Sequence, residues 1–210
     1  LFILSFALLF IAEPILAAEA DRLFVAVGYG GRRMSSRDGV HWSNDVEWAA
    51  KGGDDDNVLF NVAFAKAKFV AVGGSMTGRI VTTTDGKTWH EQPKIKWRVA
   101  TIAFGNGRFV AGHTDHFLFS DDGDTWTEGQ KHTFKGGIHM RKCAFGNGVF
   151  VVTGDADRWK LPSETENPRR MGCRAVTKNG EKFDSLQIDT PPARGIAFGN
   201  GRFVVVGPDG

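Results

Sequence analysis

Short apolar stretches separated by tight polar turns recur along the chain. Four segments share this pattern: NVAFAKAKFVAVGG from Asn61, TIAFGNGRFVAGH from Thr101, KCAFGNGVFVVTG from Lys142 and GIAFGNGRFVVVG from Gly195. A fifth, RLFVAVGYG from Arg22, has only the second half. Three of the turns read Gly-Asn-Gly, and Asn-Gly accepts the positive φ angles that a two-residue hairpin turn requires. The pattern therefore predicts a series of β-hairpins.

A second signature, Ser/Thr-x-Asp-Gly-x-x-Trp, follows the hairpins. The Asp side chain can accept hydrogen bonds from nearby backbone N–H groups, and Gly supplies a positive φ. The aromatic residue can pack between adjacent sheets. Because the motif repeats, we interpret its residues as structural rather than catalytic. The complete copies are Ser36, Asp38, Gly39 and Trp42; Thr83, Asp85, Gly86 and Trp89; and Ser120, Asp122, Gly123 and Trp126; a weakened copy is Thr177, Asn179, Gly180 and Phe183.

This combination resembles the Asp-box family, also known as BNR or bacterial neuraminidase repeats. The resemblance implies an all-β fold, a β-propeller of four-stranded blades, with the motif at the turn between the third and fourth strands. It implies no single activity, because the family includes sialidases, other glycoside hydrolases, sorting receptors and assembly factors.

Counting repeats predicts about four and a half blades of an incomplete ring within residues 21–210. In a closed ring, the inner strand that blade 1 lacks would come from sequence beyond Gly210. The alternative is a closed four-blade ring, which would leave the stretch from Arg202 redundant. The expected blades are 21–50 without an inner strand, 57–92, 97–130, 138–188 and a partial blade at 195–210.

The N-terminal stretch from Leu1 to Ala12 is almost wholly apolar. It is shorter than the ~20 residues that span a bilayer. Its length and the small residues Ala18 and Ala20 match a signal peptide, so residues 1–20 predict export to the periplasm, the cell surface or the medium. A buried N-terminal helix is the alternative, although Pro14 interrupts the stretch.

Charge and cysteine positions exclude a nucleic-acid-binding function and a disulfide. The chain has 26 Lys and Arg against 24 Asp and Glu, a net charge of +2, which does not fit a dedicated nucleic-acid binder. Its two cysteines, Cys143 and Cys173, fall on strands separated by another strand. That separation exceeds disulfide reach, so we expect free thiols.

Variable loops on the face opposite the hairpin turns are the expected ligand surface. Bases precede the predicted inner strands, and more bases and a Trp lie in the longest loop. A Trp beside bases can hold a sugar or an anion. The alternative is a scatter of surface bases with acidic neighbours such as Asp155. The candidate residues are Arg98, Arg141 and Arg194 near the inner strands, and Arg158, Trp159, Lys160, Arg169 and Arg170 in the loop.

The sequence gives only weak signals for metal binding or for catalysis. His113, Asp115 and His116 are metal-ligand types, but one loop supplies too few ligands, so we predict neither metal nor cofactor. The sialidase resemblance implies a Tyr–Glu pair, yet no Glu is evidently placed beside Tyr29, and the catalytic residues are unknown. We therefore expect an exported, non-catalytic module that binds a protein or a glycan. The alternative is a sialidase-like glycoside hydrolase whose catalytic residues lie largely in further blades.

Overall fold

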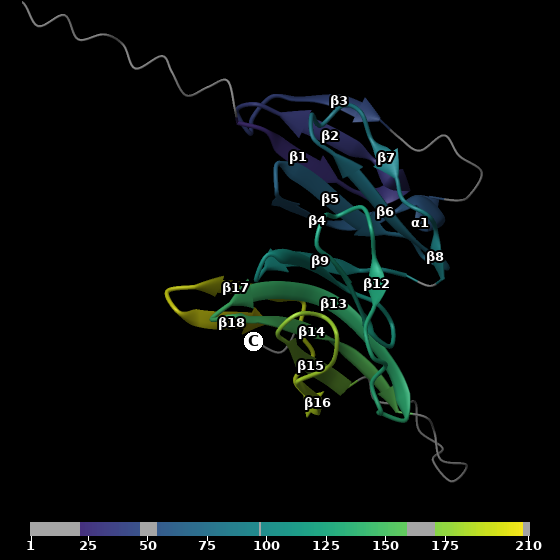
Figure 1. Cartoon of the computed structure of the whole chain (residues 1–210), viewed down its shortest axis with the longest axis vertical. Helices are drawn as coiled ribbons and strands as arrows, with labels where there is room; N and C mark the ends of the chain where they lie inside the picture. Colours follow the sequence, from purple (N-terminus) through teal and green to yellow (C-terminus); the bar gives the residue numbers. More distant parts are fainter. Residues whose placement is uncertain (1–21, 47–53, 97, 159–170, 208–210) are drawn as a thin grey trace, which may run out of the picture.

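The computed structural model describes residues 22–46, 54–96, 98–158 and 171–207, and these form mainly antiparallel β-sheets (Figure 1). The fold class predicted from the sequence is confirmed, because the sheets follow one another as blades of a propeller with an open ring. The leader predicted over residues 1–20 lies outside the described residues.

Each sheet is a meander in which strands consecutive in sequence pair antiparallel. The first sheet holds β1 (Phe24–Val27), β2 (Arg33–Ser36) and β3 (Trp42–Val46). The second holds β4 (Leu59–Ala65), β5 (Lys68–Gly73), β6 (Thr77–Thr83) and β7 (His90–Glu91), and β8 (Ile95–Lys96) also pairs with β6. The third holds β9 (Thr101–Gly105), β10 (Arg108–Gly112), β11 (Phe117–Ser120) and β12 (Thr127–Glu128).

The fourth sheet holds β13 (Gly136–Gly146), β14 (Val149–Arg158), β15 (Met171–Thr177) and β16 (Ser185–Thr190). The fifth holds β17 (Gly195–Gly199) and β18 (Arg202–Val206). Two short helical segments, η1 (Tyr29–Gly31) and α1 (Asp54–Asn57), lie in the loops.

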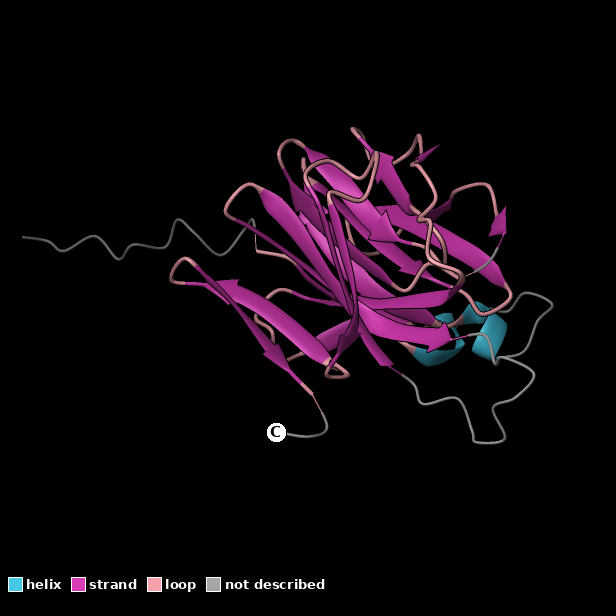
Figure 2. Cartoon of the chain, turned by 90° about the horizontal axis from the view of Figure 1, so that it is seen from below, coloured by secondary structure: helices cyan, strands magenta, loops and turns pink. Residues whose placement is uncertain are grey.

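The first strands of the second, third, fourth and fifth sheets line the inside of the array. Strands β4, β9, β13 and β17 contact one another in that order, and Figure 2 shows the sheets fanning out. Because these four strands have equivalent places in the repeat, their N-terminal ends face the same way. The residues just before them therefore gather at one end of the inner wall.

Apolar cores fill the spaces between neighbouring sheets. One core combines Val70 and Val72 of β5 with Phe109 of β10, and Trp126 packs against it. In the next, the ring of Phe183 lies 4.6 Å from that of Phe117, centroid to centroid. Burial of one large side chain is worth about 2–3 kcal/mol.

Repeated glycines allow adjacent inner strands to approach closely. A Cβ on Gly105 would lie 2.2 Å from the ring of Phe145, and one on Gly146 would lie 2.3 Å from the ring of Phe198. Both distances are far below van der Waals contact. The glycines that end the Ala-Phe-Gly segments of β9 and β13 therefore each pack against a phenylalanine of the following blade.

The turns of the Asp-Gly motif are built on side-chain acceptors. The Asp122 carboxylate accepts backbone N–H bonds from Asp124 at 2.8 Å and Thr125 at 2.7 Å. These N–H donors, with that of Thr125 foremost, lower the pKa of Asp122 to about 2. Asp38 and Asp85 have the same pair of bonds, and Gly39, Gly86, Gly123 and Gly180 have φ between +71° and +83°.

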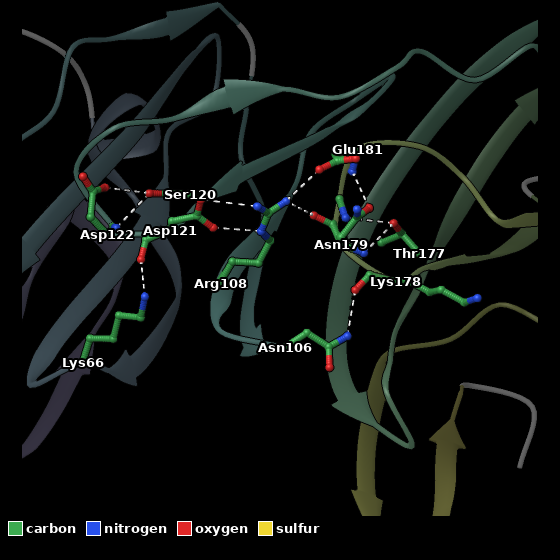
Figure 3. A network of polar contacts seen from close by, with 12 residues as sticks. Lys66, Asn106, Arg108, Ser120, Asp121, Asp122, Thr177, Lys178, Asn179 and Glu181 are labelled. Atoms are coloured by element: carbon green, nitrogen blue, oxygen red, sulfur yellow. Dashed lines mark hydrogen bonds and ion pairs between the residues drawn. The ribbon is translucent and has the colours of Figure 1, made fainter.

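Polar contacts join the turns of neighbouring blades (Figure 3). The Asn106 amide donates to the carbonyls of Gly148 and Lys178, at 2.9 and 3.0 Å. The Arg108 guanidinium donates to Asp121 at 2.9 Å in its own blade and to Glu181 at 3.0 Å in the next. Side chains at the hairpin-turn end of the array therefore link neighbouring blades.

Both cysteines are free thiols, as predicted. Strand β14 separates them, because Val152 pairs with Cys143 on one side and Gly154 pairs with Cys173 on the other.

Candidate binding site

The residues that precede the inner strands occupy equivalent positions in the repeat. Phe60, Arg141 and Arg194 directly precede Asn61, Lys142 and Gly195. The strand register shifts at Phe60 between Leu59 and Asn61, and at Arg141 between Met140 and Lys142. Such a bulge re-aims a side chain away from the regular alternation of a strand. The fold thus presents Phe60 and Arg141 from irregular positions at the same end of their strands.

Asp155 of β14 links two of these arginines. Arg141 Nε donates to Asp155 Oδ2 at 2.5 Å, and Arg194 Nη1 donates to Asp155 Oδ1 at 3.3 Å. The carboxylate is only 1% exposed, whereas the side chains of Arg141 and Arg194 are 31% and 54% exposed. A buried acid therefore holds two arginines that still reach solvent.

Arg98 is the third arginine of this group. Its guanidinium lies 5.5 Å from the ring centroid of Phe60, in cation–π range. Burial lowers the pKa of Arg98, and the nearby charge of Arg141 lowers it further, while Asp155 opposes both. We call Phe60, Arg98, Arg141, Asp155 and Arg194 the arginine cluster.

The chemistry of the arginine cluster suits an anionic ligand. Three arginines and one aspartate leave a local excess of two positive charges. A guanidinium carries five N–H donors, and the bonds to Asp155 use one nitrogen each from Arg141 and Arg194. The fork of a guanidinium matches a carboxylate or a phosphate, and the Phe60 ring offers an apolar surface beside it.

The structure brings together part of the predicted site. Arg141 and Arg194 bond to Asp155, and Arg98 lies close enough to Asp155 and Arg141 to feel their charges. Arg158 ends β14, and Trp159, Lys160, Arg169 and Arg170 lie outside the described residues. Their part in the site stays a prediction.

Sequence reasoning missed Phe60 and treated Asp155 as a surface neighbour. The repeat alignment contains a signal for Phe60, because it holds the place of Arg141 and Arg194. Asp155 follows Gly154 in β14, after the apolar run from Val149 to Val152, which is a weaker signal.

A separate cleft lies between the first two sheets. Its volume is about 630 Å³, and its lining includes Phe24, Phe64, Phe69, Ala67 and Asp85. Ala67 and Asp85 belong to turns at the hairpin-turn end, opposite the starts of the inner strands. The cleft is therefore distinct from the arginine cluster.

Several solved structures share the fold. A structure described as YCF48 bound to D1 peptide matches at 17% identity and a TM-score of 0.50, over 84% of this chain and 68% of that one. The computationally designed Ika8 protein matches at 16% and 0.53, over 88% of this chain and 52% of that one. A Cellvibrio cellulosa α-L-arabinanase matches at 10% and 0.44, over 76% of this chain and 68% of that one.

At these identities the likeness concerns the fold alone. No family model matches the chain, and no curated protein matches it. Among the described residues, no helix has the length and apolar character needed to cross a membrane.

Proposed function

We propose that this chain is an exported, non-catalytic binding module whose arginine cluster takes a carboxylate-bearing segment of a protein or peptide. Export rests on the apolar leader in the sequence. The binding proposal rests on one observation: Arg98, Arg141 and Arg194, from three successive blades, converge around a single buried carboxylate.

The charge arrangement favours an anionic ligand. Asp155 neutralises one arginine of three, so an incoming carboxylate meets a net positive site with donors in place. Asp155 also fixes Arg141 and Arg194 before the ligand arrives, which reduces the side-chain entropy lost on binding.

The position of Phe60 favours a peptide over an isolated small anion. Its ring is 38% exposed and lies beside Arg98. A peptide can place an apolar side chain on this ring while its carboxylate meets the guanidinium groups. The likeness to YCF48, which was solved with a peptide bound, makes peptides the first ligands to test.

The contacts of Asp155 favour binding over hydrolysis. Most glycoside hydrolases use two carboxyl groups that face the substrate. Both Asp155 oxygens instead accept hydrogen bonds from arginines, so this carboxylate is engaged within the protein.

A peptide array tests the proposal. Acidic peptides with a free C-terminal carboxylate are compared with the same peptides amidated. We expect binding to the free acids, and a loss of at least about tenfold in affinity for Arg141→Gln, since a hydrogen bond between charged groups contributes 1.5–3 kcal/mol.

Arg202→Gln is the matched control, because this exposed arginine begins β18 at the hairpin-turn end. Equal binding of acid and amide forms, or an equal loss for Arg202→Gln, would refute the site. Hydrolysis of a fluorogenic sialoside by the chain would refute the non-catalytic assignment.

A further inference from the structure

A second cluster of ligand-type side chains lies in the loop between β10 and β11, apart from the arginine cluster. His113, Asp115 and His116 place one ligand atom each within 4.8 Å of one another. The His113 N–H donates to the His116 carbonyl at 3.1 Å, which closes the loop into a tight turn. Both imidazoles are 3% exposed, whereas Asp115 is half-buried. The fold thus brings two buried imidazoles and a carboxylate together.

The hydrogen bonds of His113 determine which of its nitrogens is a donor. Nε2 lies 2.6 Å from the carbonyl oxygen of Lys96, which can only accept, so Nε2 carries the proton. In a neutral ring Nδ1 then has a lone pair. This nitrogen lies 3.2 Å from Asp115 Oδ1, a second electron-pair donor. The Thr114 hydroxyl also lies 3.2 Å from Nδ1. A cation between Nδ1 and Oδ1 would bring the lone pairs of both groups into bonding contact.

His116 has the complementary arrangement. Its Nδ1 lies 2.5 Å from the same Asp115 Oδ1, a carboxylate oxygen that accepts, so without a metal this nitrogen carries the proton. An ion at Asp115 Oδ1 would replace that contact and bind the other neutral tautomer of His116, whose proton is on Nε2. Its Nε2 is buried, has no hydrogen-bond partner among the described residues and lies 3.9 Å from Glu128 Oε2. Both rings therefore direct one nitrogen to Asp115 and the other toward an oxygen from a different segment. His113 donates its second N–H to the Lys96 carbonyl, as metal-ligating histidines characteristically do with a carbonyl or carboxylate.

We propose that His113 Nδ1, Asp115 Oδ1 and His116 Nδ1 form a binding site for a Zn²⁺-type divalent transition-metal ion. Two imidazoles and one carboxylate suit this class, and three protein ligands leave a coordination position for water. The Lys96 carbonyl orients the His113 ring, and Glu128 is the carboxylate that the His116 Nε2–H would face. This site is independent of the proposed peptide-binding function.

Loop neighbours provide further features to test. Lys131 Nζ lies 2.9 Å from Asp115 Oδ2, so its positive charge opposes a cation at the other oxygen. His132 donates its backbone N–H to the Asp115 carbonyl at 3.0 Å, and neither of its ring nitrogens has a hydrogen-bond partner in the part of the chain that the structure describes.

The experiment is a Zn²⁺ titration of the EDTA-treated chain without a histidine tag, against a chromogenic zinc indicator. We expect one saturable site that millimolar Mg²⁺ does not occupy. His116→Gln and Asp115→Asn should weaken it by at least about tenfold, and Glu128→Gln by several-fold, as loss of an orienting partner does. Lys131→Gln should tighten it.

His139→Gln is the control, because this histidine pairs with Asp157 at 2.7 Å in another blade and should leave zinc affinity unchanged. Glu128 is 68% exposed, so its variant tests the site without endangering the fold. Co²⁺ substitution of the unaltered chain adds an independent readout, with visible absorption bands expected for tetrahedral nitrogen and oxygen ligation.

No saturable binding, equal occupancy by Mg²⁺, equal weakening by His139→Gln, or unchanged affinity in both Glu128→Gln and a folded His116→Gln would each overturn the proposal.

Discussion

Replacing Asp155 with asparagine removes the negative charge that Arg141 and Arg194 share. The amide keeps one acceptor oxygen and turns an NH₂ donor toward the other guanidinium, so one ion pair becomes a donor–donor contact. Breaking a fully buried pair by removing one partner costs about 3–5 kcal/mol. Here the two arginines are partly exposed and regain water, so we expect about 2 kcal/mol. That lowers Tm by about 4–8 °C in a chain of this size.

The same substitution should strengthen anion binding. A ligand carboxylate about 6 Å from Asp155 experiences roughly 1.4 kcal/mol of repulsion at an effective dielectric of about 40, which corresponds to tenfold in affinity. Asp155→Asn should therefore bind acidic peptides up to tenfold more tightly, and added salt should erase most of the gain.

Thermal denaturation and fluorescence anisotropy with an acidic peptide measure the two effects. Asp121→Asn is the control, since this 70% exposed partner of Arg108 should cost less than about 1 kcal/mol and leave peptide affinity unchanged. A lower Tm together with weaker peptide binding would mean that the loss of two fixed arginines outweighs the loss of repulsion, which contradicts our reasoning.

Three further predictions concern stability. Ala67 has a φ of +56° in a turn where other blades have glycine, so Ala67→Gly should raise unfolding free energy by about 1 kcal/mol; an unchanged or lower chemical-denaturation midpoint would contradict this. Because the pKa of Asp122 falls from 3.8 to about 2 on folding, its carboxylate stabilises the folded state fully above about pH 4 and loses this effect toward pH 2. Asp122→Asn should therefore flatten the plot of Tm against pH over that range. An equally steep plot for the variant would contradict this prediction. Arg108→Gln should lower the free energy of unfolding in urea by about 1–2 kcal/mol, because it breaks contacts within one blade and to the next. The control Lys182→Gln should leave that free energy almost unchanged. An equal loss in both variants would refute the bridging role of Arg108.

The fold was predictable because the sequence signals that specify its hairpins are local and repeat along the chain. Asn-Gly turns and Ala-Phe-Gly segments specify hairpins within a few residues, and repetition shows that such hairpins stack. The packing of Phe145 against Gly105 also follows from the repeated Ala-Phe-Gly segments, although this contact joins two blades.

The sites were less predictable because their partners come from distant segments. Arg98, Arg141 and Arg194 were candidates from their places before the inner strands, but the burial of Asp155 follows only from the packing of β14. The histidine loop appeared to have too few ligands, since sequence spacing could not show the Lys96 carbonyl or Glu128 beside it.

Hydrogen exchange of the chain with a bound acidic peptide tests the central claim, that the starts of the inner strands form the binding surface. We predict slower backbone exchange in residues 98–103, 139–142 and 193–196, with turns 106–107 and 147–148 unchanged. Slowing confined to those turns would place the ligand at the opposite end of the blades and contradict the account.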